Sequence, residues 1–349
     1  MAQDWREGIN LIRLAAWMDT QQLGTGTIDA ARPLTGGTQN LLLLFVRDGR
    51  SYVLRRPPVH LRPGNNETML KEARVLAALA GTHVPHPRLI AKCQDEQVLG
   101  AAFYLMEPVD GVNITVNMPL LYSGDPLIRT RLGEALIDAI AALGRIDYLA
   151  VGLGDLGKVD GFLERQVSRW YSQYLSYRTH PGWPGVGSLP EVDTVAQWLE
   201  RNRPSSFLPG IMHGDYQLSN VLVRTDTAAV AAIVDWELAT IGDPLLDLGW
   251  LLATWPEPDG RGGVFEVTPW EGFPPANELI ARYAEQSPRN LGSIEWYTVL
   301  ACFKLGILNE GTYARACSGK AARDTGERLH GISVRLLERA REMIGHGLG

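Results

Sequence analysis

The stretches Ile211–Asn220, IMHGDYQLSN, and Ile233–Pro244, IVDWELATIGDP, decide the fold of this chain. The first holds Asp215 and Asn220 just before a short apolar run, and the second holds Asp235 at the end of another. A polar turn separates the two runs, so we expect a hairpin that brings the three side chains to a common edge. Carboxylate and amide oxygens are the ligands that Mg²⁺ prefers. The two stretches therefore predict a metal and phosphate site.

The order and spacing of these residues match the catalytic residues of protein kinases. In that arrangement an Asp orients the hydroxyl that is phosphorylated, here Asp215, and an Asn and a second Asp hold Mg²⁺, here Asn220 and Asp235. His213 precedes Asp215 by two residues, as the pattern requires. Asp and Asn are also common in turns, so the alternative is that these residues only form turns at the ends of strands. The complete set in this order favours catalysis.

Composition and charge exclude several classes of protein. The 349 residues carry 33 basic and 39 acidic side chains, a net charge of −6, so no basic field indicates a nucleic-acid partner. No apolar run approaches the roughly 20 residues that span a bilayer. The three cysteines have no zinc-ligand spacing and fit a reducing compartment. We expect a soluble, cytoplasmic protein that binds neither nucleic acid nor membrane.

The predicted secondary structure changes after about residue 108, from mainly strands to mainly helices. Residues 1–108 contain a leading helix at residues 4–20 with Asp4 as its cap, strand patterns with an Asp48-Gly49 hairpin turn, and one helix near 67–81. Residues 109–349 are mainly helical, with short strands near 220–235. The predicted fold class is α+β, with a small N-terminal lobe of antiparallel sheet and a larger, helical C-terminal lobe. The helical segments expected in the second lobe are 125–145, 158–176, 190–202, 276–285, 292–315 and 320–344.

Two segments of the first lobe have the residues of a nucleotide site. The turn TGGTQN contains Thr35, Gly36, Gly37 and Asn40 between strands, where phosphates are covered in kinases. In SYVLRRPP the side chains alternate, so Val53 and Arg55 share one face and supply an apolar floor and a cation. The alternatives are an ordinary hairpin turn and solvated arginines.

The helix that follows supplies a carboxylate for this cation. Glu72 shares a helical face with the apolar residues Val75, Leu76 and Leu79. A buried charge without a partner is costly, and Arg55 is the expected partner of Glu72. A strand cation followed by a helix carboxylate repeats the kinase order. The first lobe therefore supports the interpretation of the second.

Motifs along most of the chain resemble a known family. These are LTGGTQN, YVLRRPP, KEARVLAAL, VPHPRLI, VLGAAFYLMEPVDG, RQVSRWYSQY, HGDYQLSNVLV, AAIVDWELATIGDPLLDLGW and LNEGTYARACSG. They are similar to the aminoglycoside phosphotransferase-like kinases, in particular to the branch that is fused to acyl-CoA dehydrogenases. The resemblance runs from about Leu34 to Gly319 and implies a bilobal, protein-kinase-like fold.

The resemblance also implies a role for each matching residue. Asp215 would be the catalytic Asp, Asn220 and Asp235 the Mg²⁺ ligands, and Arg55 and Glu72 the phosphate-contacting pair. Arg55 stands where kinases usually have Lys, although the branch that the chain resembles shares this feature, and the two cations are not equivalent.

Two further segments have implied roles. Met106–Val109 would be the hinge, with the Glu107 carbonyl and the Val109 amide facing adenine. Asp243 is interpreted as the start of a helix, and Asp247 as the residue that anchors the catalytic loop from within that helix.

The expected function is phosphoryl transfer from ATP, with GTP as an alternative donor, to a hydroxyl of a small molecule with Mg²⁺. The branch implies a hydroxyacyl-CoA or hydroxy acid as the acceptor. An aminoglycoside or sugar kinase, a non-catalytic nucleotide-binding protein and a metal-dependent phosphohydrolase are the alternatives. The acceptor and the oligomeric state stay open.

Overall fold

The computed structural model describes residues 5–34, 40–256 and 263–347. The chain divides into two compact units, each described here by itself. The first contains Met1–Gly111 and also Ala231–Ala239, and the second contains Val112–Val230 and Thr240–Gly349. The predicted lobes, 1–108 and 109–349, do not include the return of Ala231–Ala239 to the first unit. This return gives Asp235 to the first unit.

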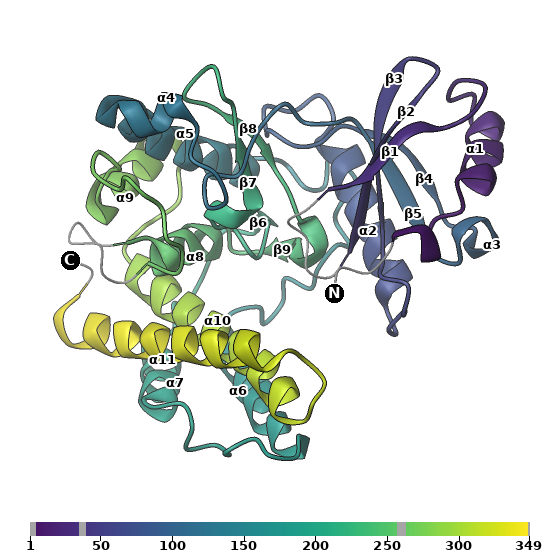
Figure 1. Cartoon of the computed structure of the whole chain (residues 1–349). Coiled ribbons are helices and arrows are strands. Elements are labelled where there is room, and N and C mark those ends of the chain that lie inside the picture. Colours follow the sequence, from purple (N-terminus) through teal and green to yellow (C-terminus); the bar gives the residue numbers. More distant parts are fainter. Residues whose placement is uncertain (1–4, 35–39, 257–262, 348–349) are drawn as a thin grey trace. The chain divides into compact units, whose positions relative to one another are not determined.

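An antiparallel sheet forms the centre of the first unit (Figure 1). The hairpin turn between its second and third strands is at Asp48 and Gly49, with φ of 51° and 70°, which confirms the predicted Asp-Gly turn. The sheet has the order β1-β2-β3-β5-β4, from β1 (Asp29–Pro33), β2 (Leu41–Arg47), β3 (Arg50–Arg56), β4 (Leu89–Cys93) and β5 (Phe103–Met106).

Helices cover both faces of this sheet, α1 (Leu11–Thr20) on one and α2 (Asn65–Leu79) on the other (Figure 1). A short helix, α3 (Glu96–Leu99), precedes β5. Leu54 of β3 lies in the core on the α1 side. The next residue, Arg55, meets α2 instead, as the alternation of a strand requires.

The predicted helix at residues 4–20 begins later than expected. A short 3-10 turn spans Trp5–Glu7, and α1 starts only at Leu11. Asn10 caps it, since its side-chain oxygen accepts the N–H groups of Ile12 and Arg13 at 3.1 Å each. Asp4, the expected cap, lies outside the described residues.

The second unit is mainly helical, as predicted. Its helices are α4 (Leu120–Gly124), α5 (Pro126–Gly144), α6 (Glu164–Ser176), α7 (Val192–Arg201), α8 (Leu245–Thr254), α9 (Ala276–Gln286), α10 (Ile294–Cys317) and α11 (Arg323–His346). Six of these match the predicted segments, although α6 starts six residues later than the predicted 158. Gly161 has a φ of +63°, which a right-handed helix does not contain, so the chain turns before α6.

Short strands connect the helices of this unit. β6 (Gly210–Met212) pairs antiparallel with β9 (Thr240–Gly242), and Met212 is opposite Thr240. β7 (Val221–Val223) and β8 (Val230–Ile233) are the two strands of the predicted hairpin, and Ala231–Ile233 of β8 belong to the segment that returns to the first unit. The residues His213–Asn220, between β6 and β7, carry the motif with which the sequence analysis began.

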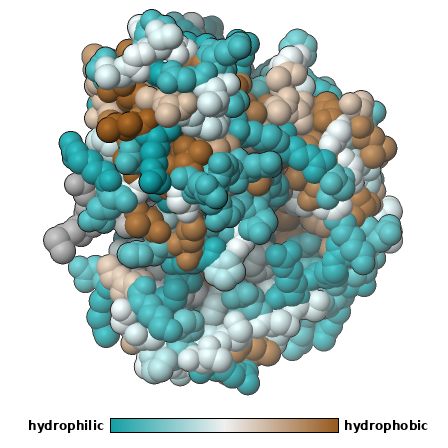
Figure 2. Space-filling model, turned by 90° about the vertical axis from the view of Figure 1, so that its right-hand side faces the viewer, coloured by the Kyte–Doolittle hydropathy of each residue, from teal (hydrophilic) through white to brown (hydrophobic). Residues whose placement is uncertain are grey.

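In Figure 2 hydrophilic side chains cover much of the visible face, with hydrophobic groups between them, as is usual for a folded protein. Among the described residues, none of the helices combines the length and the hydrophobicity that a membrane span requires.

The packing of α8 on α10 depends on a glycine. A β-carbon on Gly249 would lie 2.6 Å from the backbone carbon of Tyr297 and 2.9 Å from the nitrogen of Thr298. Backbone atoms of a buried helix cannot move aside as a flexible side chain does. Gly249 therefore permits the close approach of the two helices.

We expect Gly249→Ala to lower the free energy of unfolding by about 2–3 kcal/mol, because the added methyl group overpacks this contact. Urea unfolding monitored by circular dichroism measures the change. Gly331→Ala in α11 is the matched control, since its β-carbon would meet only the end of Arg335, at 3.7 Å. Gly331→Ala should leave the free energy of unfolding unchanged or raise it, because Ala favours helix more than Gly does. Equal effects of the two substitutions would contradict this account.

Candidate functional site

A buried carboxylate in the second unit holds the loop His213–Asn220 in place. Asp247, on α8, accepts hydrogen bonds from the backbone N–H groups of His213 at 2.6 Å and Gly214 at 2.7 Å. Burial raises the pKa of Asp247 to about 6, while these two N–H groups act in the opposite direction. The contacts confirm that Asp247 anchors this loop. Asp243 accepts the N–H of Leu245 at 3.0 Å and so caps the start of α8.

The Asp215 carboxylate is oriented by two neighbours on the same loop. Gln217 donates to one carboxylate oxygen at 2.8 Å, and Asn220 donates to the other at 2.8 Å and to the Asp215 backbone carbonyl at 2.9 Å. The half-buried carboxylate is therefore held in one orientation. His213 is buried, and its Nδ1 accepts the N–H of Asp215 at 3.3 Å.

The same contacts orient the side-chain amide of Asn220. Because the Asn220 amide nitrogen donates hydrogen bonds to Asp215, the amide oxygen is the atom that remains for a cation. An amide oxygen suits a hard ion such as Mg²⁺. The structure thus brings Asp215 and Asn220 together, as predicted, and their catalytic and metal-binding roles stay predictions.

Lys304 is a functional candidate that the sequence analysis missed. It is buried on α10, and its Nζ donates to the carbonyl of Gly214 at 3.2 Å. The same nitrogen lies 4.5 Å from the ring centre of Trp250 and 5.3 Å from that of Trp170. Burial lowers the pKa of Lys304 to about 8, although the Asp215 and Asp247 carboxylates oppose this shift. A single Lys inside the apolar run LACFKLGIL was the available signal.

In the first unit, Arg55 joins two carboxylates. Its Nε lies 3.0 Å from Glu72 Oε2, and its Nη2 donates to Asp235 Oδ1 at 2.6 Å. Glu72 is fully buried and also accepts the Tyr104 hydroxyl at 3.0 Å. Burial raises the pKa of Glu72 to about 7, and Arg55 opposes the shift. Burial alone would lower the pKa of Arg55, but its anionic partners raise it above the ordinary value. The predicted Arg55–Glu72 pair is therefore present.

Asp235 is held in an unusual backbone conformation. Its φ of +67° is left-handed, which is uncommon for a residue with a side chain. Arg55 donates to one carboxylate oxygen of Asp235. The Asp235 side chain is 37% exposed, so its second oxygen is open to a cation. Its oxygen, like that of Asn220, is of the type that Mg²⁺ binds. Strain of this kind is found at functional positions.

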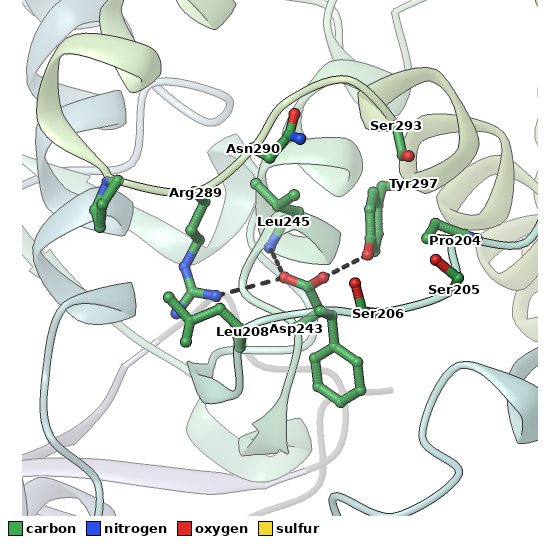
Figure 3. Close-up of a pocket in the computed structure, with 12 residues that line it drawn as sticks. Pro204, Ser205, Ser206, Leu208, Asp243, Leu245, Arg289, Asn290, Ser293 and Tyr297 are labelled. Carbon is green, nitrogen blue, oxygen red and sulfur yellow. Dashed lines mark hydrogen bonds and ion pairs between the residues drawn. The ribbon is translucent and has the colours of Figure 1, made fainter.

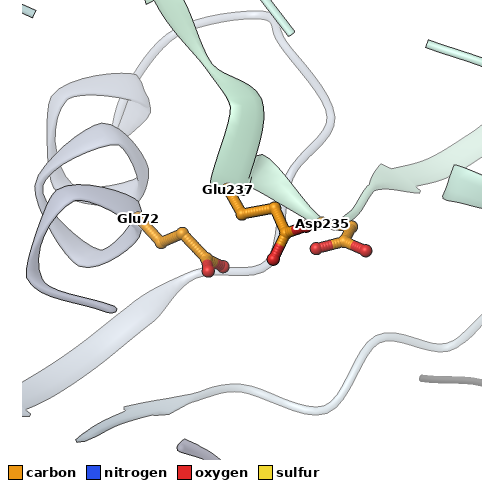
Figure 4. Close-up of side chains that lie close together, drawn as sticks. All are labelled: Glu72, Asp235 and Glu237. Carbon is orange, nitrogen blue, oxygen red and sulfur yellow. The ribbon is translucent and has the colours of Figure 1, made fainter. Parts of the chain in front are cut away.

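Glu237 is a second residue that the sequence analysis did not select. Glu72, Asp235 and Glu237 offer oxygens within 4.8 Å of one another (Figure 4). Asn40 donates to Glu237 at 3.5 Å, and Lys71 donates to its backbone carbonyl at 2.5 Å. This contact fits the predicted place of Asn40 beside the site, whereas Thr35, Gly36 and Gly37 lie outside the described residues.

In the predicted hinge, two backbone groups are available for hydrogen bonds to a ligand. Within the described chain, the carbonyl of Glu107 and the N–H of Val109 take part in no hydrogen bond. The Glu107 side chain, in contrast, accepts from Arg50 at 3.0 Å. Val53 is buried in β3 opposite Met106. An acceptor, a donor and an apolar floor fit an adenine base, and the roles of these residues stay predictions.

A cavity of about 410 Å³ in the second unit is lined by residues outside the Asp215 loop (Figure 3). Its charged groups already pair, because Asp243 lies 3.7 Å from Arg289 and accepts the Tyr297 hydroxyl. Arg289 also donates to the carbonyl of Leu208, on the segment before β6, whereas the Asp215 loop follows β6. This network is structural.

Lys304→Met should change how stability depends on pH. Because the pKa of Lys304 falls from 10.5 to about 8 in the folded protein, the unfolded chain binds more protons there between these values. The free energy of unfolding of the unsubstituted protein should therefore rise relative to the variant, by roughly 3 kcal/mol across that range.

Urea unfolding at pH 7, 8.5 and 10 measures this difference. Lys92→Met removes an exposed lysine and is the control, for which the difference should not change over the same range. A pH-independent difference for Lys304→Met would mean that Lys304 titrates as an exposed lysine does.

Comparisons with known proteins agree with this geometry. The model of the phosphotransferase enzyme family (APH) matches residues 30–287. Acyl-CoA dehydrogenase family member 11 from Rattus norvegicus is 31% identical over 293 residues, which cover 81% of this chain and 36% of that protein. The chain spans between about a quarter and two-fifths of the length of the curated relatives it matches.

Solved structures have the same fold. A Ralstonia eutropha protein, named provisionally as an aminoglycoside phosphotransferase, is 30% identical, with a TM-score of 0.77 over 95% of this chain and 98% of its own. A thermostable mutant of aminoglycoside phosphotransferase APH(4)-Ia, in a ternary complex with AMP-PNP and hygromycin B, is 14% identical. It has a TM-score of 0.59 over 92% of this chain and 98% of its own, and so shows the fold alone. The chain therefore belongs to the phosphotransferase enzyme family and has the protein-kinase-like fold that its motifs predict.

Proposed function

We propose that the chain is a kinase that uses ATP and Mg²⁺ to phosphorylate a hydroxyl group of a small molecule. The observation that carries the proposal is the oriented carboxylate of Asp215, held at 2.8 Å by Gln217 and by Asn220. Membership of a phosphotransferase family supports the reaction class. The AMP-PNP complex of a protein with this fold supports ATP as the donor, with GTP as the alternative.

In the proposed step, the Asp215 carboxylate orients the acceptor hydroxyl and accepts its proton. The hydroxyl oxygen forms a bond to the γ-phosphorus while the bond from that phosphorus to the β–γ bridging oxygen breaks. The products are the phosphorylated acceptor and ADP. Because Gln217 and Asn220 already hold the carboxylate, little ordering is left to the moment of reaction.

The first unit would bind the nucleotide. Arg55 would contact the phosphates and Glu72 would hold Arg55 in place, since a guanidinium fork binds a carboxylate and a phosphate together. The Glu107 carbonyl and the Val109 N–H would bind adenine. Asn220 and Asp235 would hold Mg²⁺ through their open oxygens. The ion, when bound, would neutralise charge on the transferred phosphoryl group.

For the acceptor we propose a hydroxyacyl-CoA or a hydroxy acid. The support is that the curated relatives are acyl-CoA dehydrogenase family proteins, of which this chain matches a part. An aminoglycoside or another sugar is the alternative, because the APH(4)-Ia complex contains hygromycin B. A panel of hydroxyacyl-CoAs, hydroxy acids, aminoglycosides and sugars in a coupled ADP-release assay separates these classes.

Asp215→Asn should lower kcat by about 10³-fold, because it removes the group that orients the hydroxyl and accepts its proton. Binding of ATP with Mg²⁺ should stay within about threefold by calorimetry, since Asp215 is not expected to contact the nucleotide base. Asp324→Asn, at an exposed position in α11, is the control and should leave kcat unchanged. If the unsubstituted protein binds ATP but phosphorylates no acceptor in the panel, a non-catalytic nucleotide-binding function replaces this proposal.

Arg55→Lys should raise the KM for ATP about tenfold, because Lys keeps the charge but cannot bind a carboxylate and a phosphate through a planar fork. Arg56→Lys is the matched control. Arg56 is the next residue on β3, and it donates to the backbone carbonyl of Gly8 rather than to Glu72. Steady-state kinetics and urea unfolding of both variants separate binding from stability. Equal KM changes in the two variants would show that Arg55 acts only through the fold.

A further inference from the structure

The second unit contains a second, basic pocket. Its volume is about 260 Å³, and three of the seven residues that line it are cationic: Lys158, Arg165 and Arg169. None of the seven is acidic, in a chain whose net charge is −6. A local excess of positive charge in a concave site attracts anions.

This pocket lies beside the loop that holds Asp215. Thr240 and Ile241 of β9 form part of its wall, and Thr240 is paired with Met212 of β6. Met212 is followed directly by His213, where the loop begins. The pocket and Asp215 therefore belong to the same unit and to neighbouring segments of it.

A chain of side-chain contacts also joins the pocket to the loop. The Arg169 guanidinium lies 5.2 Å from the ring centre of Trp170, over which Lys304 also lies at 5.3 Å. Lys304 in turn donates to the carbonyl of Gly214, the residue before Asp215. Arg169 of the pocket and the backbone of the loop that carries Asp215 are thus linked through two packed side chains, Trp170 and Lys304.

Local structure holds the first two cations in the pocket wall. A β-carbon on Gly157 would lie 2.8 Å from the backbone nitrogen of Ile241, so only glycine permits this approach, which brings the adjacent Lys158 to β9. Arg165 donates to the carbonyls of Lys158, at 2.8 Å, and Asp160. Backbone carbonyls accept hydrogen bonds but do not cancel the charge of a guanidinium.

The charges of the pocket are not neutralised by neighbouring acids. In the part of the chain that the structure describes, Lys158, Arg165 and Arg169 form no ion pair with a carboxylate. The larger cavity differs in this respect, since its Arg289 lies 3.7 Å from Asp243. Of the two cavities, the smaller one has uncompensated positive charge to offer a ligand.

We propose that this pocket binds an anionic group of the acceptor, a phosphate or a carboxylate, while the acceptor hydroxyl faces Asp215. This inference rests on the proposed kinase function and specifies in addition that the acceptor is anionic. A volume of about 260 Å³ suits one charged substituent rather than a whole substrate. The three cations disfavour a polycationic aminoglycoside at this position.

Two variants with equal changes of charge test the pocket. Lys158→Gln/Arg169→Gln removes two exposed cations from its wall, and Lys320→Gln/Arg328→Gln removes two exposed cations elsewhere in the same unit. The acceptors are used in matched pairs that differ in charge: 4-hydroxybutyrate with 4-hydroxybutyramide, and 3-hydroxybutyryl-CoA with 3-hydroxybutyryl-pantetheine. The KM of each acceptor and of ATP is measured by ADP release.

The pocket variant should raise the KM of the anionic member of the preferred pair about tenfold or more. Its KM values for the neutral member and for ATP should change less than about twofold, and the control variant should change none of the three. The same KM change for both members of each pair, or no change, overturns the proposal.

Direct binding separates failure of the pocket from failure of the kinase function. The same compounds and inorganic phosphate are titrated by calorimetry into the unsubstituted protein and the pocket variant. Binding of an anionic acceptor that the pocket variant loses supports the pocket even if no acceptor is phosphorylated, a result that would overturn the kinase function alone. Equal binding by both proteins, or no binding of any anionic compound, overturns the pocket. Binding of inorganic phosphate alone means a free-anion site and overturns the acceptor assignment.

Discussion

The loop that carries Asp215 depends on one buried carboxylate. Asp247 accepts the N–H groups of His213 and Gly214, and both of these residues are buried. A buried backbone donor without an acceptor costs roughly 1–3 kcal/mol, so a loop in this conformation requires such a partner. Lys304 completes the arrangement by donating to the Gly214 carbonyl. The backbone before Asp215 is thus satisfied on both its donor and its acceptor side, and the Asp215 carboxylate is oriented by Gln217 and Asn220.

The first unit also contains a buried charge, the Glu72 carboxylate, that requires partners. Glu72 has no exposed surface, and an isolated carboxylate there would be strongly unfavourable. Arg55 and the Tyr104 hydroxyl supply its partners, and Arg55 also reaches Asp235 on the segment that returns to this unit. The guanidinium can serve both because its donors form a planar fork. This geometry gives a physical reason for Arg at a position where kinases usually have Lys.

The parts of the site that could be predicted follow local rules of spacing. Asp215 and Asn220 are five residues apart on one loop, and the Arg55–Glu72 pair follows from strand alternation and helical offsets. Lys304 and Glu237 could not be selected in this way, because their roles depend on which distant segments pack against them. The return of Ala231–Ala239 to the first unit is likewise a tertiary property. Thr35, Gly36 and Gly37 remain predictions from their motif.

The basic pocket, which we propose as part of the acceptor site, is harder to predict from sequence than the Asp215 motif. A catalytic motif is compact in the sequence because one loop holds its groups at fixed distances. The pocket instead combines a loop residue, Lys158, with Arg165 and Arg169 one helical turn apart on α6, and with the wall of β9. Their meeting depends on the close approach at Gly157, which no charge pattern indicates. In the sequence, Asp160 and Glu164 stand between Lys158 and Arg165, and the segment resembles a solvated surface. Folding separates the two signs, since the lining of the pocket contains the cations and none of the acids. This separation would be the physical basis for the proposed selection of an anionic acceptor.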